Sequence, residues 1–154
     1  MTTLHANSPQ ESLARLESLC LLAGLDLPLR AIRAQVAAAI DAVLCTSRLQ
    51  DGRRVVTQVT EVAPLDERGD YRVRDIFVYT QTGRGADGSV QGYLAPTGLV
   101  PSSQYSLFAN GFHDLTDAFF SPATYGYPPP PYFLGGGSDT GATAGDFTPG
   151  AGGR

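Results

Sequence analysis

DGRRVVTQVTEV, residues 51–62, contains the strongest signal for the fold in this sequence. Asp51-Gly52 is a tight-turn dipeptide of the kind that joins two antiparallel strands. After it, the residues alternate with the period of two that places successive side chains on opposite faces of a strand. One face would carry Val56, Gln58, Thr60 and Val62, and the other Val55, Thr57, Val59 and Glu61. We therefore predict a hairpin whose second strand spans this stretch.

The flanking segments extend this hairpin into a sheet. The run Asp41–Leu49 fits a buried strand or further helix by its period, and we favour the strand. A polar loop at 66–70 leads to a third strand, residues 71–80, and the turn GRGADGS, residues 83–89, leads to a last short strand, 90–98. Strands joined by such short turns form an antiparallel meander. The glycine-rich turn precedes no helix and contains no lysine, so it does not predict a phosphate-binding loop.

Two helices are predicted ahead of the strands. Ser8, Pro9 and Glu11 form a start signal, in which an S-x-x-E capping box satisfies the first amide groups of the helix. Gly24 ends this helix, and its apolar residues at helical spacing are Leu13, Leu16, Cys20 and Ala23. A second helix is predicted from near Pro28, with Arg30 and Arg33 on one flank and, on another side, Leu29, Ile32, Val36, Ala39 and Ile40.

The C-terminal third begins ordered and ends in low complexity. We predict a short helix over 102–109 and a further helical turn over 114–120. From about Ala123 the chain is rich in glycine and proline, including a four-proline run at 128–131. Such a segment buries too little apolar surface to offset its ordering entropy. The predicted organisation is therefore one α/β domain, residues 1–122, and a disordered tail, 123–154.

Composition excludes several kinds of chemistry. The chain contains no lysine, and all 11 basic residues are arginines, so a Schiff base and a P-loop lysine are excluded. A net charge of -4 argues against nucleic acid as a partner. Cys20 and Cys45 have no Cys or His at ligand spacing and predict small buried hydrophobes rather than metal ligands. The N-terminus lacks the pattern of a signal peptide, and no apolar run is long enough to span a membrane, so we expect a cytoplasmic protein without membrane insertion.

Several segments together resemble one family. They are HANSP (5–9), RLESLCLLAGLDLPLRAIRAQVAAAIDAVL (15–44), SRLQDGRRVVTQVTEV (47–62) and RDIFVYTQTGRGADGSVQGYLAPTGLVP (74–101). In the same order, they are similar to the C-terminal third of CpaF-type ATPases, members of the type II/IV secretion ATPase superfamily that power Flp (tight-adherence) pilus assembly. The resemblance covers about residues 1–120. It implies the C-terminal portion of a RecA-like P-loop ATPase domain.

The same resemblance implies partners and a site. The intact family protein would be a homo-hexamer that binds ATP and Mg²⁺ and docks on pilus or secretion platform proteins at the inner membrane. The segment TTLHAN would be its His box, with His5 as the catalytic histidine near the γ-phosphate and Thr2 and Thr3 beside it. Arg30 and Arg33 match arginines of the family's LPLRAIR helix. They would lie near nucleotide or a subunit interface, or else pair with carboxylates on the helix surface.

The family's P-loop and acidic boxes precede its His box. We therefore expect this chain to lack them, to bind no nucleotide tightly and to be inactive alone, because P-loop, lysine and Mg²⁺ carry most of the catalysis in such enzymes. The chain would then be a C-terminal segment of the motor. The alternative is a non-catalytic interaction module that binds an intact ATPase ring or a pilus-assembly partner. For Glu61, which alternates in register with a strand face, we expect a structural role.

Overall fold

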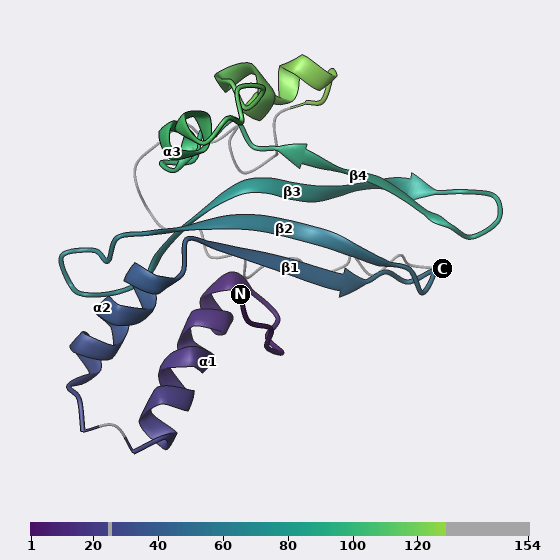
Figure 1. Ribbon diagram of the computed structural model, residues 1–154. Helices are drawn as coiled ribbons and strands as arrows, with labels where there is room; N and C mark the ends of the chain where they lie inside the picture. Colours follow the sequence, from purple (N-terminus) through teal and green to yellow (C-terminus); the bar gives the residue numbers. More distant parts are fainter. Residues whose placement is uncertain (25, 129–154) are drawn as a thin grey trace.

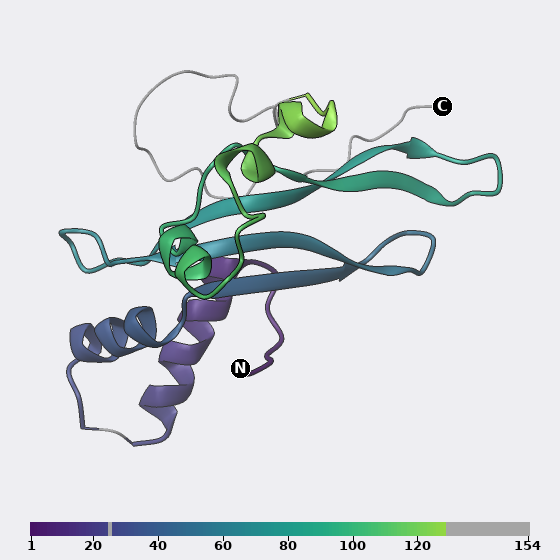
Figure 2. The same cartoon turned by 45° about the horizontal axis from the view of Figure 1, so that its top comes forward.

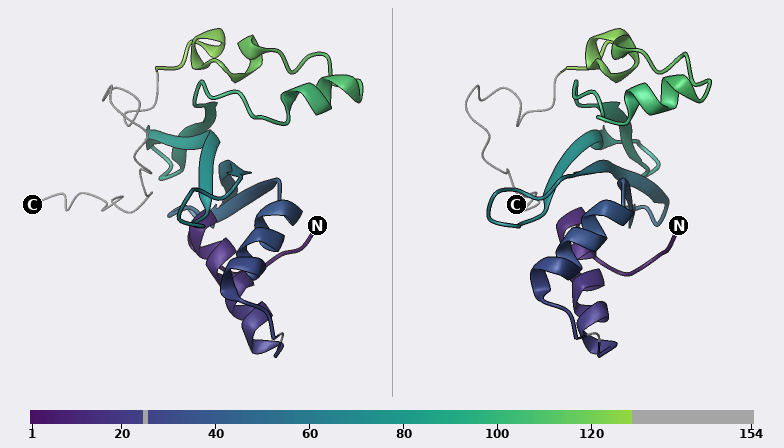
Figure 3. Two further views of the ribbon diagram at one scale, coloured as in Figure 1. Left: turned by 90° about the vertical axis from the view of Figure 1, so that its left-hand side faces the viewer. Right: turned by 60° about the vertical axis from the view of Figure 1, so that its left-hand side comes forward.

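The computed structural model describes residues 1–24 and 26–128 and contains a four-stranded sheet with helical segments on two sides of it (Figure 1). In Figures 1 and 3 the sheet separates α1 and α2 from α3 and the two short 3-10 turns. The elements in chain order are α1 (Pro9–Leu22), α2 (Leu29–Ala39), β1 (Ala42–Arg48), β2 (Arg54–Ala63), β3 (Arg72–Arg84), β4 (Val90–Pro96), α3 (Gln104–Ala109), η1 (Asp117–Phe120) and η2 (Pro122–Tyr125).

The sheet is an antiparallel meander with the strand order β1-β2-β3-β4. The prediction of two helices followed by an antiparallel meander is confirmed, and the ambiguous run Asp41–Leu49 forms a strand, β1. At the predicted hairpin, Gly52 has a φ of 89°, and its N–H donates to the carbonyl of Leu49 at 2.9 Å. A β-bulge on β2 follows this turn, because Cys45 pairs with Gln58 whereas Thr46 pairs with Val56.

The start of α1 forms as the sequence predicts. Ser8 is the N-cap, and its hydroxyl accepts from the N–H of Glu11 at 3.2 Å. The Glu11 carboxylate reaches back one residue further than in the usual capping box, to the N–H of Asn7 at 2.9 Å. These bonds fix the point at which the extended N-terminal segment becomes helix.

The main core lies where α1 and α2 meet one face of the sheet. Its buried residues come from both helices and from β2, namely Leu13, Ile32, Val36 and Val62. Leu29, which the sequence placed on the same side of α2, is 42% exposed. The expectation that both cysteines are buried holds only in part, since Cys20 packs against this core half-buried and Cys45 is half-buried in β1. The core is therefore small.

A second apolar contact joins the C-terminal segments to the sheet. The ring of Phe77 on β3 lies with its centroid 5.9 Å from that of Phe119 and 6.1 Å from that of Phe120. The predicted helical turn over 114–120 is a 3-10 turn, η1, and the helix over 102–109 is α3.

The ordered body extends beyond the predicted boundary at residue 122. Residues 123–128, which the sequence assigned to the tail, include most of η2, and Tyr127 stacks on Tyr93 with ring centroids 3.9 Å apart. Aromatic side chains thus hold a stretch that its glycine and proline content marks as tail. The rest of the predicted tail, 129–154, lies outside the described residues.

Candidate functional site

Three of the predicted site residues lie in the N-terminal segment ahead of α1. Thr2, Thr3 and His5 are exposed. Within residues 1–24 and 26–128, their side chains form no hydrogen bond or ion pair with the rest of the protein. The capping contacts of Ser8 and Glu11 place this segment at the end of α1 that adjoins the sheet (Figure 1). The three side chains are therefore free to meet another group.

Arg33 is held by carboxylates. Its Nε donates to Glu17 on α1 at 2.9 Å, and its Nη1 donates to Asp70 in the β2–β3 loop at 2.7 Å. The hydrogen bond that Arg33 donates to Glu17 is the main reason that the pKa of Arg33 is raised above its ordinary value. The guanidinium also lies 6.0 Å from the ring centroid of Tyr71. Of the two interpretations open for this arginine, the geometry supports the carboxylate-paired one.

Arg30 differs from Arg33. It lies in the first turn of α2 beside Gly69, it is exposed, and it forms no ion pair within the described part of the chain. Figures 1 and 2 show the N-terminal segment and α2 on opposite sides of α1. The structure therefore does not bring Arg30 and Arg33 together with His5 into one constellation.

The Arg33 network gives a testable prediction. Arg33→Gln should lower the free energy of unfolding by about 1 kcal/mol, because it removes two partly shielded ion pairs that tie α1, α2 and the β2–β3 loop. Arg30→Gln is the matched control and should change it by less than about 0.5 kcal/mol. Urea titrations followed by circular dichroism compare the two. An equal loss of unfolding free energy in Arg33→Gln and Arg30→Gln would contradict the structural role of Arg33.

The sequence missed a buried charge cluster on the opposite face of the sheet. Glu61 is 5% exposed, and its Oε2 accepts from the guanidinium of Arg74, with Nε at 3.0 Å. Its Oε1 accepts from the N–H of Ser102 at 2.7 Å and from the hydroxyl of that residue. Burial raises the pKa of Glu61, but the bonds from Ser102 and Arg74 outweigh burial and hold it below its ordinary value. The short loop between β2 and β3 was the available signal, since it sets Glu61 opposite Arg74.

An apolar cleft lies beside this cluster, between the sheet and the α3–η1 segment. Its lining includes Val59, Phe77, Leu107, Leu115 and Phe119, together with Glu61. Both carboxylate oxygens of Glu61 are already occupied by Arg74 and Ser102. The Glu61 carboxylate is therefore not free to act on a ligand in this mainly apolar cleft, whose lining also includes Asp41, Thr60 and Ser103.

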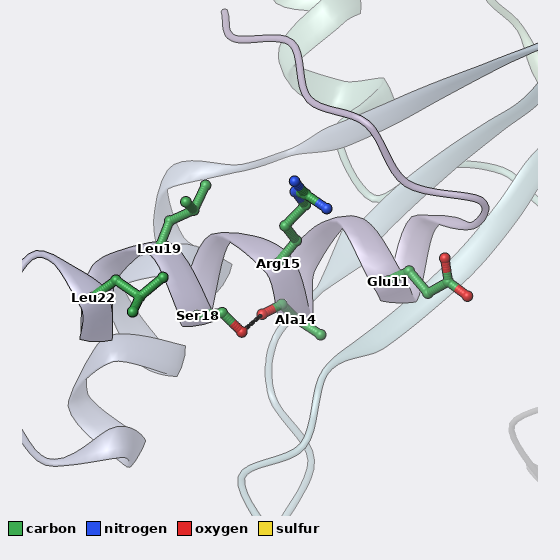
Figure 4. A pocket seen from close by; sticks show the side chains of 6 residues that line it. All are labelled: Glu11, Ala14, Arg15, Ser18, Leu19 and Leu22. Carbon is green, nitrogen blue, oxygen red and sulfur yellow. Dashed lines mark hydrogen bonds between the residues drawn. The ribbon is translucent and has the colours of Figure 1, made fainter.

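A second hollow lies along α1 and is lined by side chains of that helix alone (Figure 4). Ser18 donates to the carbonyl of Ala14 at 3.0 Å, so its hydroxyl is engaged within the helix. Glu11 and Arg15 are the charged residues of the lining, and Figure 4 shows them pointing away from each other. No second element contributes a group, and the hollow is a groove on one helix face rather than a site.

The comparisons with known proteins add no identification. No protein-family model matches the chain, and a search of curated proteins found no match. Among the described residues, no three His, Cys, Asp or Glu side chains are grouped so that they could hold a metal ion. None of the helices in residues 1–24 and 26–128 has the length and apolar character needed to cross a membrane.

Proposed function

We propose that this chain is the C-terminal segment of a CpaF-type secretion or pilus-assembly ATPase and supplies the His-box side of its nucleotide site. The observation that carries the proposal is the exposed segment of Thr2, Thr3 and His5, which has no partner in the described structure and stands directly ahead of a capped helix. The resemblance assigns this position to the His box. The two helices and the antiparallel sheet lie within the segments that carry the resemblance.

The RecA-like domain, the hexameric ring and the inner-membrane platform partners belong to the same proposal. ATP and Mg²⁺ would be held mainly by P-loop and acidic groups, and a chain without lysine has no P-loop lysine. His5 would then donate a ring N–H to a γ-phosphate that other residues grip. Thr2 and Thr3 would offer hydroxyl donors beside it. The chain alone would leave this histidine with no phosphate to contact.

The test is complementation. The full chain is mixed with the part of a CpaF-type ATPase that carries the P-loop and ends before the His box, and phosphate release is measured. Phosphate release by either component alone should stay at background, and phosphate release by the mixture should exceed it. His5→Ala should lower turnover of the mixture by about 100-fold, the range seen when one positioned donor is lost. His113→Ala is the matched control, because His113 is also exposed and its ring lies against Phe108, with ring centroids 4.5 Å apart.

Three results would count against the proposal. One is hydrolysis by this chain alone above background. Another is no gain in turnover when the two components co-elute on a sizing column. The third is equal loss from His5→Ala and His113→Ala.

A second candidate function is a non-catalytic interaction module that binds an intact ATPase ring or a pilus-assembly partner. It is favoured by the leucines at the α1–α2 end of the molecule, which are exposed, with Leu22 at 82%. This candidate predicts that the chain co-elutes with an intact ATPase, that His5→Ala leaves binding unchanged and that Leu22→Asp abolishes it. Failure to co-elute with an intact ATPase, or binding that Leu22→Asp leaves unchanged, supports the first candidate.

A further inference from the structure

The outer edge of β1 carries unpaired backbone groups. The carbonyl of Asp41 accepts from Val62 at 2.9 Å and the N–H of Leu49 donates to Arg53 at 2.7 Å, so these two residues turn their backbone groups toward β2. Because backbone groups alternate along a strand, the even-numbered residues 42, 44, 46 and 48 turn theirs outward. Within residues 1–24 and 26–128, no backbone group beyond the β2 ladder bonds to them.

This edge lacks two features by which edge strands often avoid pairing, a charged side chain and a proline in the interior of the strand. Between Asp41 and Arg48 the strand has neither a charge nor a proline, and Leu44 is 63% exposed at its middle. The other edge strand, β4, is different. It ends in Pro96, which has no N–H, and Tyr127 stacks on its Tyr93.

The charges along β1 are self-complementary. Asp41 stands at one end, and Arg48 at the other is paired in register with Arg54, which sets two like charges side by side. In the described part of the chain, none of these three side chains forms an ion pair. An antiparallel neighbour of the same sequence would bring its acidic end beside this basic end, with Asp41 opposite Leu49 of the second copy and next to its Arg48.

We propose that β1 pairs antiparallel with β1 of a second copy about a two-fold axis, so that two four-stranded sheets become one. One register engages all four outward residues. It sets Ala42 opposite Arg48 of the second copy, Leu44 opposite its Thr46, and Cys45 opposite its Cys45. This proposal does not depend on the ATPase assignment, because it concerns the chain by itself.

The first test is the oligomeric state of the full chain by sedimentation equilibrium. The wild type should be a concentration-dependent dimer. Thr46→Pro removes an outward N–H in each copy, a position where an edge strand tolerates proline, and should weaken the dimer by about 100-fold. Leu44→Lys sets two positive charges near the axis and should also dissociate it. Leu94→Lys, on the same face of the other edge strand, is the matched control and should leave the dimer intact.

Cross-linking tests the register. Residues facing each other in a non-hydrogen-bonded pair have Cα atoms about 4.5 Å apart, which falls within the range of about 4.4–6.8 Å for disulfides. Cys20→Ser retains only Cys45 and should give a covalent dimer under mild oxidation at alkaline pH, where the thiol ionises although burial raises the pKa of Cys45. Cys45→Ser retains only Cys20 and should stay monomeric on a non-reducing gel.

Several outcomes would overturn the proposal. The proposal is wrong if the chain is a monomer at every concentration or if it forms open-ended aggregates. A dimer that survives both Thr46→Pro and Leu44→Lys with the native circular dichroism spectrum would move the interface elsewhere. Cross-linking through Cys20 and not Cys45 would exclude the β1 pairing.

Discussion

Leu13→Ala should lower the free energy of unfolding by about 3 kcal/mol, the typical cost of truncating a fully buried leucine. Leu13 on α1 is 0% exposed and belongs to the cluster with Ile32, Val36 and Val62. The variant loses the transfer free energy of three carbon atoms and leaves a cavity that α2 and β2 cannot easily fill. Urea titration followed by far-ultraviolet circular dichroism measures the change.

Leu22→Ala on the same helix is the matched control. Leu22 is 82% exposed, so its truncation should change the free energy of unfolding by less than about 0.5 kcal/mol. Because a domain of this size has a total stability of about 5–15 kcal/mol, the Leu13 variant should be partly unfolded at temperatures the control tolerates. Similar midpoints for the two variants would mean that α1 is not docked on the sheet as described.

Glu61→Gln should lower the free energy of unfolding by about 2 kcal/mol at neutral pH. A buried ion pair that loses one partner costs about 3–5 kcal/mol, but the Arg74 side chain is 36% exposed and recovers some hydration. The amide also cannot accept all four donors that the carboxylate accepts from Arg74 and Ser102. Glu67→Gln, in the exposed β2–β3 loop, should have almost no effect and serves as the control.

The same pair of variants gives a pH dependence. The pKa of Glu61 is lower in the folded protein than its ordinary value of 4.5, which stands for the unfolded chain. Its stabilisation is therefore fully present above that value and is lost as the pH falls through the folded pKa. Wild type and Glu67→Gln should lose stability on acidification more steeply than Glu61→Gln. Hydrogen bonds from Arg53 and Val90 lower the pKa of Asp51 to about 2. Asp51 is present in all three proteins, so its contribution to the pH dependence cancels in the comparison.

Much of the fold was predictable because the signals are local. The Asp51-Gly52 turn and the Ser8 cap each act within a few residues, and each is found in the structure. Residues 58–62 alternate between the two faces as predicted, but the bulge at Thr57 sets Val56 on the face of Val59 and Glu61, and Val55 on the face of Gln58 and Thr60. The contacts of residues 123–128, which lie beyond the boundary predicted at residue 122, have no such local signal. Composition reports only conformational entropy and total apolar surface. The ring of Tyr127, in contrast, stacks on Tyr93, which lies 34 positions earlier in the sequence.

The candidate site was less predictable than the fold. Arg30 and Arg33 have the same residue type on the same helix, yet Arg33 has two carboxylate partners and Arg30 has none in the described residues. Those partners, Glu17 and Asp70, come from different elements, and only the packing of α1 and of the β2–β3 loop brings them together. The Glu61–Ser102 contact spans 41 positions and has no local signature. The nucleotide-site roles of Thr2, Thr3 and His5 remain a prediction.

The contacts of Asp51 have a consequence for how the sheet opens. From the β1–β2 turn, its Oδ2 accepts from the N–H of Val90 on β4 at 2.7 Å, and the guanidinium of Arg53 donates to the carbonyl of Val90. These hydrogen bonds join the end of the β1–β2 hairpin to the β3–β4 hairpin. Amide hydrogen exchange at Val90 would accordingly require the two hairpins to separate, and its protection would report the cooperative opening of the sheet rather than fraying of one turn.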